Sequence, residues 1–120
     1  AMTAASRAMS MQLICTKTCG TCRKAVALLE EKGIAFEYRE YREDPLSKAE
    51  LQDVLKKLGM GPRDVLRTRD ANKLGLSGDE SDEALLELMA EHPTLLQRPI
   101  GILGDKAALG RPPETLLEIV

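Results

Sequence analysis

Blocks of apolar and polar positions predict an alternation of strands and helices in the first third of the chain. Residues 11–15 form a short apolar run that predicts a strand, and a polar loop follows it. From Thr21 to Lys32 apolar side chains recur at helical spacing, and Gly33 favours the end of that helix. Residues 34–41 then alternate apolar and polar side chains, which predicts a second strand. Because the connections are short, we expect a right-handed crossover between two parallel strands.

Helical patterns fill the middle of the chain. Ser47 has the spacing of a capping box, and the apolar face that follows it predicts a helix ending at Gly59. Pro62 can start a short helix through Leu66. A further helix is expected from Ser81 to the His92-Pro93 pair, which ends it.

The last part of the chain predicts two short strands and a closing helix. The strands are expected at residues 100–103 and 107–109, on either side of a turn at Gly104-Asp105. The closing helix is expected to open at Pro112. Since the chain has no internal repeat and no linker composition, we expect one α/β domain into which the middle helices are inserted.

The charge balance argues against a nucleic-acid partner. The 120 residues include 17 basic and 19 acidic side chains, which gives a net charge of −2. Nucleic-acid binding generally needs a strong basic excess, and with two tyrosines, one phenylalanine and no tryptophan there is little to stack on bases. No apolar stretch approaches the ~20 residues that span a bilayer. We therefore expect neither nucleic-acid nor membrane binding.

The N-terminal segment and the cysteines indicate where in the cell the protein is expected. Residues 1–10 lack a basic region followed by a continuous apolar one, so they predict a disordered tail rather than a signal peptide. All three cysteines lie between positions 15 and 22, which is unlike the disulfide framework of a secreted domain. We expect a cytoplasmic protein whose cysteines carry out chemistry.

Two of the cysteines lie at the start of the first predicted helix. Cys19 precedes the helix, where free backbone amides and the positive end of the helix dipole favour a thiolate. Cys22 lies one turn further on, so a Cys19–Cys22 disulfide is geometrically possible. Cys22 also fits as a small residue of the apolar helix face. Cys15 ends the apolar strand, which favours a buried and inert thiol.

The spacing of Cys15, Cys19 and Cys22 also matches the CxxxCxxC motif of radical-SAM enzymes, which bind a [4Fe–4S] cluster. Those enzymes are considerably longer than this chain. A tetrahedral zinc site would need a fourth ligand, and the only histidine, His92, lies far away in the sequence at a helix end. We therefore expect no bound metal.

Five short motifs are spread along the chain: Cys19-Gly20-Thr21, Val65-Leu66-Arg67, His92-Pro93, Arg98-Pro99-Ile100 and Gly110-Arg111-Pro112. In combination they resemble the ArsC family, and specifically its thioredoxin-fold arsenate reductases that take electrons from glutathione and glutaredoxin. The resemblance extends from about Met11 to Val120. It implies an α/β fold with a thioredoxin-like mixed sheet flanked by helices. That fold would be a single domain over residues 11–120, with a helical insertion at about 45–97.

The resemblance implies a reaction on an oxyanion. Cys19 corresponds to the nucleophile, which forms a covalent adduct with arsenate. Backbone amides at Gly20 and Thr21 would help to hold the anion at the helix start. Planar guanidinium groups offer paired donors that match the oxyanion oxygens. Three arginines correspond to the family's oxyanion-binding positions: Arg67, Arg98 and Arg111.

A second thiol completes the reaction that the resemblance implies. Cys22 can resolve the adduct as an intramolecular partner, with thioredoxin as electron donor. Glutathione with glutaredoxin is the other system, and Cys15 can serve only if the loop brings it near. We expect no bound metal or organic cofactor, and a monomer.

Two positions depart from the glutaredoxin-coupled reductases, which often carry histidine where Cys15 stands and commonly serine where Cys22 stands. Residues 19–25 are correspondingly similar to Spx, a redox-sensing regulator that binds RNA polymerase. A Spx-like regulator and a general glutathione-dependent thiol reductase are therefore alternatives. The Arg111-Pro112 pair favours an oxyanion-binding enzyme, because Spx-type sequences generally lack an arginine followed by proline there.

Overall fold

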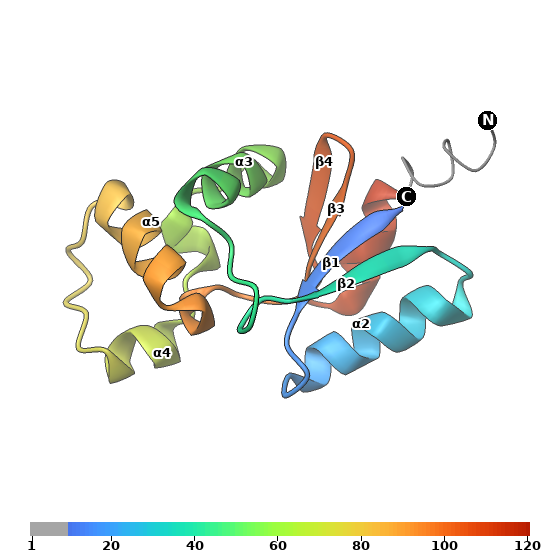
Figure 1. Ribbon diagram of the computed structural model, residues 1–120, viewed down its shortest axis with the longest axis horizontal. Coiled ribbons are helices and arrows are strands. Elements are labelled where there is room, and N and C mark those ends of the chain that lie inside the picture. The colour runs from blue at the N-terminus through green and yellow to red at the C-terminus, as the bar shows by residue number, and fades with distance from the viewer. Residues whose placement is uncertain (1–9) are drawn as a thin grey trace. The chain divides into compact units, whose positions relative to one another are not determined.

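The computed structural model describes residues 10–120, and Figure 1 shows their course. These residues divide into two compact units, one of residues 10–40 with 98–120 and the other of residues 41–97. The predicted N-terminal tail lies almost wholly outside the described residues. The predicted helical insertion at about 45–97 falls within the second unit.

The first unit is built on a four-stranded mixed sheet with the strand order β2-β1-β3-β4 (Figure 1). The pair β1–β2 is parallel, whereas β1–β3 and β3–β4 are antiparallel. The sequence prediction of a parallel first pair is therefore confirmed. The elements are β1 (Met11–Cys15), α2 (Gly20–Glu31), β2 (Phe36–Glu40), β3 (Ile100–Leu103), β4 (Lys106–Leu109) and a closing 3₁₀ helix, η3 (Pro113–Ile119).

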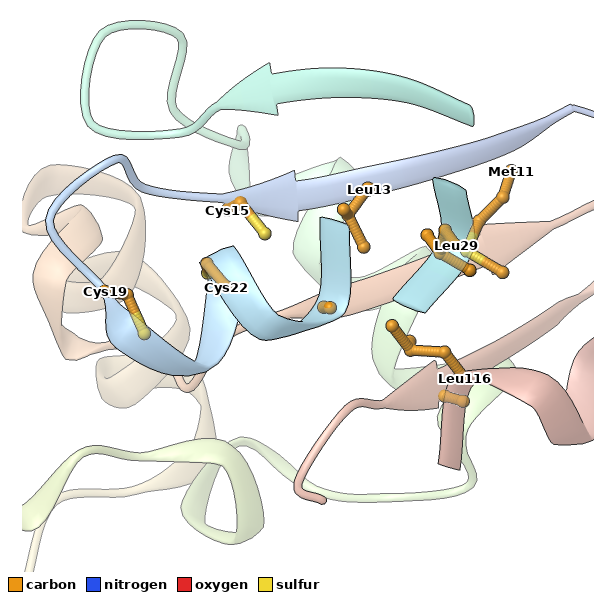
Figure 2. Packing of buried hydrophobic residues seen from close by; sticks show 9 residues of the cluster. Met11, Leu13, Cys15, Cys19, Cys22, Leu29 and Leu116 are labelled. Carbon is orange, nitrogen blue, oxygen red and sulfur yellow. The ribbon is translucent and has the colours of Figure 1, made fainter. Parts of the chain in front are cut away.

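The core of this unit forms where α2 and η3 pack against the sheet. Alternate residues of β1 point to one face, and residues three and four apart on α2 share one side of the helix, so both elements bury apolar stripes. Figure 2 shows the two stripes meeting. The cluster consists of Met11, Leu13, Cys15, Cys19, Cys22, Ala25, Leu29, Ala108 and Leu116.

The closing segment is a tight helix. The closing helix expected to open at Pro112 is present over residues 113–119, and it is a 3₁₀ helix. The amide of Thr115 donates to the carbonyl of Pro112 at 3.0 Å, which is the tighter bond of that geometry. Its buried anchor is Leu116.

The second unit consists of helices linked by short loops. They are α3 (Lys48–Leu58), η1 (Pro62–Val65), α4 (Thr68–Lys73), α5 (Asp82–Glu91) and η2 (Pro93–Leu95). Two backbone hydrogen bonds link the segment after η1 to the segment around η2. The amide of Arg67 donates to the carbonyl of Leu95 at 2.7 Å, and the amide of Gln97 donates to the carbonyl of Val65 at 2.8 Å. Among residues 10–120, no helix is both long and apolar enough to pass through a membrane.

The sequence patterns predicted α3, η1 and α5 but not α4. The capping box at Ser47 is present, and Gly59 ends α3 with a positive φ of 70°. Ser81 likewise caps α5 by accepting from the amide of Ala84. The short helix α4 buries only Ala71, so its sequence shows no apolar stripe to predict it.

Candidate functional site

Cys19 is the N-cap of α2. Its amide donates to the carbonyl of Thr16 at 3.2 Å, which closes the loop after β1. Its own carbonyl accepts the first helical bond, from the amide of Arg23 at 3.2 Å. The side chain is 8% exposed and makes no bond to the amides of the first turn. The thiol therefore lies at the positive end of the helix dipole, and the first turn of α2 contains no acidic side chain to offset it.

Gly20 and Thr21 are the first residues of α2. Amides in the first turn of a helix have no carbonyl partner within the helix, so they can donate to an anion. Gly20 is exposed, and a β-carbon built on it would meet no atom within 4 Å. The approach to the first turn beside Cys19 is thus open.

Arg111 reaches the Cys19 thiol. Its Nη2 lies 3.9 Å from Cys19 Sγ, and its Nε donates to the carbonyl oxygen of Arg98 at 2.7 Å. Two arginines that are 13 positions apart in sequence therefore lie beside each other, with one guanidinium directed at the sulfur. A guanidinium at this distance stabilises negative charge on sulfur or on a bound anion.

The close approach of two chain segments brings these arginines together. The amide of Gly110 donates to the carbonyl of Pro99 at 2.8 Å. A β-carbon on Gly110 would lie only 2.8 Å from Cγ of Pro99, so a residue without a side chain is needed there. Each arginine precedes a proline through a cis peptide bond, Arg98-Pro99 and Arg111-Pro112.

Arg67 belongs to the second unit, where it is the N-cap of α4. Its Nε donates to a carboxylate oxygen of Asp70 at 2.7 Å. This ion pair fixes one edge of the guanidinium within its own unit. The approach of Arg67 to Cys19 stays a prediction, as does any role of His92, which ends α5 in the same unit.

The other two cysteines face each other across the first unit's core. Figure 2 shows Cys15, at the end of β1, pointing toward the first turn of α2, where Cys22 lies. Both side chains are buried, at 0% and 1% exposure, and all three cysteines are free thiols. The sequence prediction that Cys15 is buried is confirmed. Its hydrogen bond to Cys22 was not expected, because residue spacing gives no information on contacts between a strand and a helix.

The Cys22 sulfur accepts several hydrogen bonds. The bond from the Cys15 thiol, the largest effect, lowers the pKa of Cys22 to about 7, although burial opposes this change. The Thr16 amide, the Cys19 thiol and the charge of Arg98 contribute in the same direction. The bond to Cys22 and burial raise the pKa of Cys15 far above its usual range. Near pH 7, Cys22 is therefore half thiolate and Cys15 is a neutral donor.

A pocket opens on the β2 side of α2, beside Cys22. It has a volume of about 480 Å³ and is lined by Lys17, Cys22, Arg23, Val26 and Tyr38. Partial burial raises the pKa of the Tyr38 hydroxyl to about 12. This pocket could not be predicted from the sequence, because its lining comes from a loop, a helix and a strand that only the fold brings together.

A metal site would need several ligating side chains close together. Within residues 10–120, no three or more histidine, cysteine, aspartate or glutamate side chains are arranged to hold a metal ion. The expectation of a metal-free protein stays a prediction.

Comparisons with known proteins agree with this architecture. The model of the ArsC family matches residues 15–119. A protein named arsenate reductase from Haemophilus influenzae is 42% identical over 116 residues, which cover 93% of this chain and all of the relative. The solved structure of an arsenate reductase from Vibrio cholerae superposes with a TM-score of 0.83 at 38% identity, covering 93% of this chain and 98% of that one.

A regulator is also among the relatives. The global transcriptional regulator Spx of Streptococcus agalactiae is 40% identical over 91 residues, which cover 73% of this chain and 66% of Spx. The family match, by contrast, extends across nearly the whole chain, including both cysteine and arginine motifs. The chain therefore belongs to the ArsC family, and its four-stranded mixed sheet with flanking helices is the predicted thioredoxin-like fold.

Proposed function

We propose that the protein is an arsenate reductase in which Cys19 is the nucleophile. The observation that carries this proposal is the guanidinium of Arg111, 3.9 Å from Cys19 Sγ and bonded to the backbone of Arg98. A thiol at a helix N-terminus beside a guanidinium suits an attack on a tetrahedral oxyanion. The relatives named arsenate reductase support the choice of arsenate.

Electrostatics supply the binding energy for the substrate. Like a phosphate monoester, arsenate carries about one to two negative charges near pH 7. Arg98 and Arg111 offer paired N–H donors to its oxygens, and the first-turn amides at Gly20 and Thr21 add neutral donors. Arg67, the third arginine that the family resemblance implies, stays a prediction. Of these groups, Arg111 also contacts the sulfur that must attack, at 3.9 Å.

The reaction balances with two thiols. The Cys19 thiolate attacks arsenic, and a hydroxide ion leaves with one proton as water, which gives a thiol–arsenate adduct. A second thiolate then attacks Cys19 Sγ, the electrons of the sulfur–arsenic bond pass to arsenic, and arsenite leaves. Arsenic gains two electrons and the two sulfurs form a disulfide. Cys22 suits the second step because its pKa of about 7 makes a thiolate available at neutral pH.

An external thiol system must then reduce the disulfide. With Cys22 as the resolving thiol, thioredoxin serves as donor, and with glutathione as the resolving thiol, glutaredoxin does. No metal or organic cofactor is required by this scheme.

The test is arsenate-dependent NADPH oxidation with each donor system in turn. Cys19→Ser should abolish turnover with both donors. Cys22→Ser should abolish it with thioredoxin and preserve it with glutathione and glutaredoxin. Full activity of Cys19→Ser would contradict the proposal.

A Spx-like redox regulator is the second candidate, favoured by the Cys19-x-x-Cys22 spacing and the Spx relative. This role needs a thiol switch and a partner surface but no oxyanion site. Binding to RNA polymerase that depends on the oxidation state, without arsenate turnover, would favour the regulator.

A further inference from the structure

We propose that Cys15 and Cys22 form a second redox pair, in which the buried Cys15 thiol takes over the disulfide from Cys19 and leaves Cys19 free for the next substrate. This inference rests on the proposed function for its first step, the oxidation of Cys19. It extends that function by giving each of the three thiols a place in a sequence of exchanges.

The geometry favours a bond between these two sulfurs. Cys15 ends β1, where it pairs with Glu40 of β2 in the parallel ladder, so its backbone is fixed in the sheet. Cys22 lies in the first turn of α2, and the two thiols are hydrogen-bonded within the same buried cluster. Figure 2 shows the Cys15 side chain directed at this turn, whereas the Cys19 sulfur points away from β1. Of the three sulfurs, Cys22 is thus the one that both other thiols reach.

The exchange step conserves atoms and electrons. Cys15 loses its proton and its sulfur attacks Cys22 Sγ in the Cys19–Cys22 disulfide. The bond between Cys19 and Cys22 breaks, and its electron pair leaves on Cys19 as a thiolate beside Arg111. No net oxidation occurs in this step, and the proton passes to solvent or to the released thiolate. A leaving thiolate next to a guanidinium is a favourable one.

The coupling between the thiols makes Cys15 reactive at the right moment. In the reduced protein Cys15 donates its hydrogen to Cys22, and the negative charge on Cys22 further opposes ionisation of Cys15. Once Cys22 is part of a disulfide, it carries no charge. The two causes that come from Cys22 are then removed, whereas burial and the charge of Glu40 still raise the pKa of Cys15. Cys15 therefore ionises more readily once a Cys19–Cys22 disulfide exists than in the reduced protein.

Re-reduction would proceed through Cys22. Cys15 is completely buried, whereas Cys22, although only 1% exposed, lines the pocket of about 480 Å³ beside Lys17 and Arg23. An external thiol that enters this pocket can attack Cys22 Sγ and release Cys15. This entry lies on the β2 side of α2, and its lining includes neither Arg98 nor Arg111.

The test maps disulfides in the wild-type chain first. Reduced protein is oxidised in one arm by diamide and in another by arsenate without reductant, then quenched in acid, alkylated and digested with trypsin. Cleavage after Lys17 separates Cys15 from the peptide of residues 18–23, which holds both Cys19 and Cys22. In both arms we expect the peptide that holds Cys15 to be disulfide-linked to the peptide of residues 18–23. Within that second peptide Cys22 forms the disulfide and Cys19 is alkylated.

The outcomes separate the two proposals. A disulfide confined to residues 18–23, with Cys15 alkylated in the diamide arm, would overturn the Cys15–Cys22 pair. The cross-link with diamide but no oxidation by arsenate would support the pair and contradict the proposed reductase. In Cys15→Ala the cross-link between the two peptides should be absent, and the Cys19–Cys22 disulfide should persist. Circular dichroism verifies that the variant is folded.

Discussion

The hydrogen bond between Cys15 and Cys22 gives a quantitative prediction for the acidity of Cys22. Donation from the Cys15 thiol is the largest cause that lowers the pKa of Cys22 to about 7 from an ordinary value of 9.0. Cys15→Ala removes this donor and keeps the burial that opposes ionisation. The pKa of Cys22 should therefore rise toward 9.0 or above.

The size of the effect follows from the two pKa values. At pH 7 a thiol with a pKa of about 7 is half ionised, whereas one with a pKa of 9.0 is about 1% ionised. The thiolate fraction, and with it the rate of reaction with an alkylating reagent, should fall by up to about 50-fold. Because the pKa rises, the fold loss is largest at pH 7 and below and disappears well above pH 9.

The assay uses variants in which few thiols titrate. In a Cys19→Ser background, ultraviolet absorbance of thiolate against pH gives the Cys22 midpoint, and Cys15→Ala leaves Cys22 as the sole cysteine. Cys15→Ser is the matched control, since its hydroxyl can still donate to Cys22 and should hold the midpoint closer to 7. A midpoint that stays near 7 in Cys15→Ala would refute the assigned role of this hydrogen bond.

Three further substitutions test the site and the fold. Arg111→Gln should lower kcat/KM for arsenate about 10- to 150-fold, because a charge-assisted hydrogen bond contributes about 1.5–3 kcal/mol, whereas Lys106→Gln, an exposed cation on β4, should change it little. Equal losses in both would refute a specific role for Arg111. Gly110→Ala should lower the free energy of unfolding in urea by about 1–3 kcal/mol, since its β-carbon would lie 2.8 Å from Cγ of Pro99. Gly20→Ala, which meets no atom within 4 Å, should lose none, and equal effects would contradict this packing. Ser47→Ala removes the capping box of α3 and should cost about 0.5–2 kcal/mol in the same measurement, and an unchanged midpoint would show that the cap contributes nothing.

Strong local patterns allowed most of the first unit to be predicted. The apolar run at β1, the helical spacing of α2 and the glycine turn between β3 and β4 each determine their element within a few residues. The closing helix was placed correctly, and its 3₁₀ type was not predicted because Pro112 and Pro113 favour either kind of helix start. α4 was missed because a six-residue helix that buries one alanine has no periodic signal.

The site was only partly predictable for a different reason. The motif around Cys19 and the paired Arg111-Pro112 indicated an anion-binding thiol, and the structure brings Arg111 to that thiol. The contact of Cys15 with Cys22 depends on how α2 packs on β1, which no spacing rule gives. The pocket beside Cys22 likewise depends on Tyr38 of β2 and the loop residue Lys17 lying along the same helix.

The chemistry assigned to Cys19 can be tested in a single turnover. Fully reduced protein is mixed with arsenate in the absence of any reductant, and released arsenite is measured against protein concentration. We expect arsenite in proportion to the amount of protein, a matching loss of free thiols, and no arsenite from Cys19→Ser. Arsenite release by Cys19→Ser at the wild-type level would contradict the assignment of Cys19 as the nucleophile.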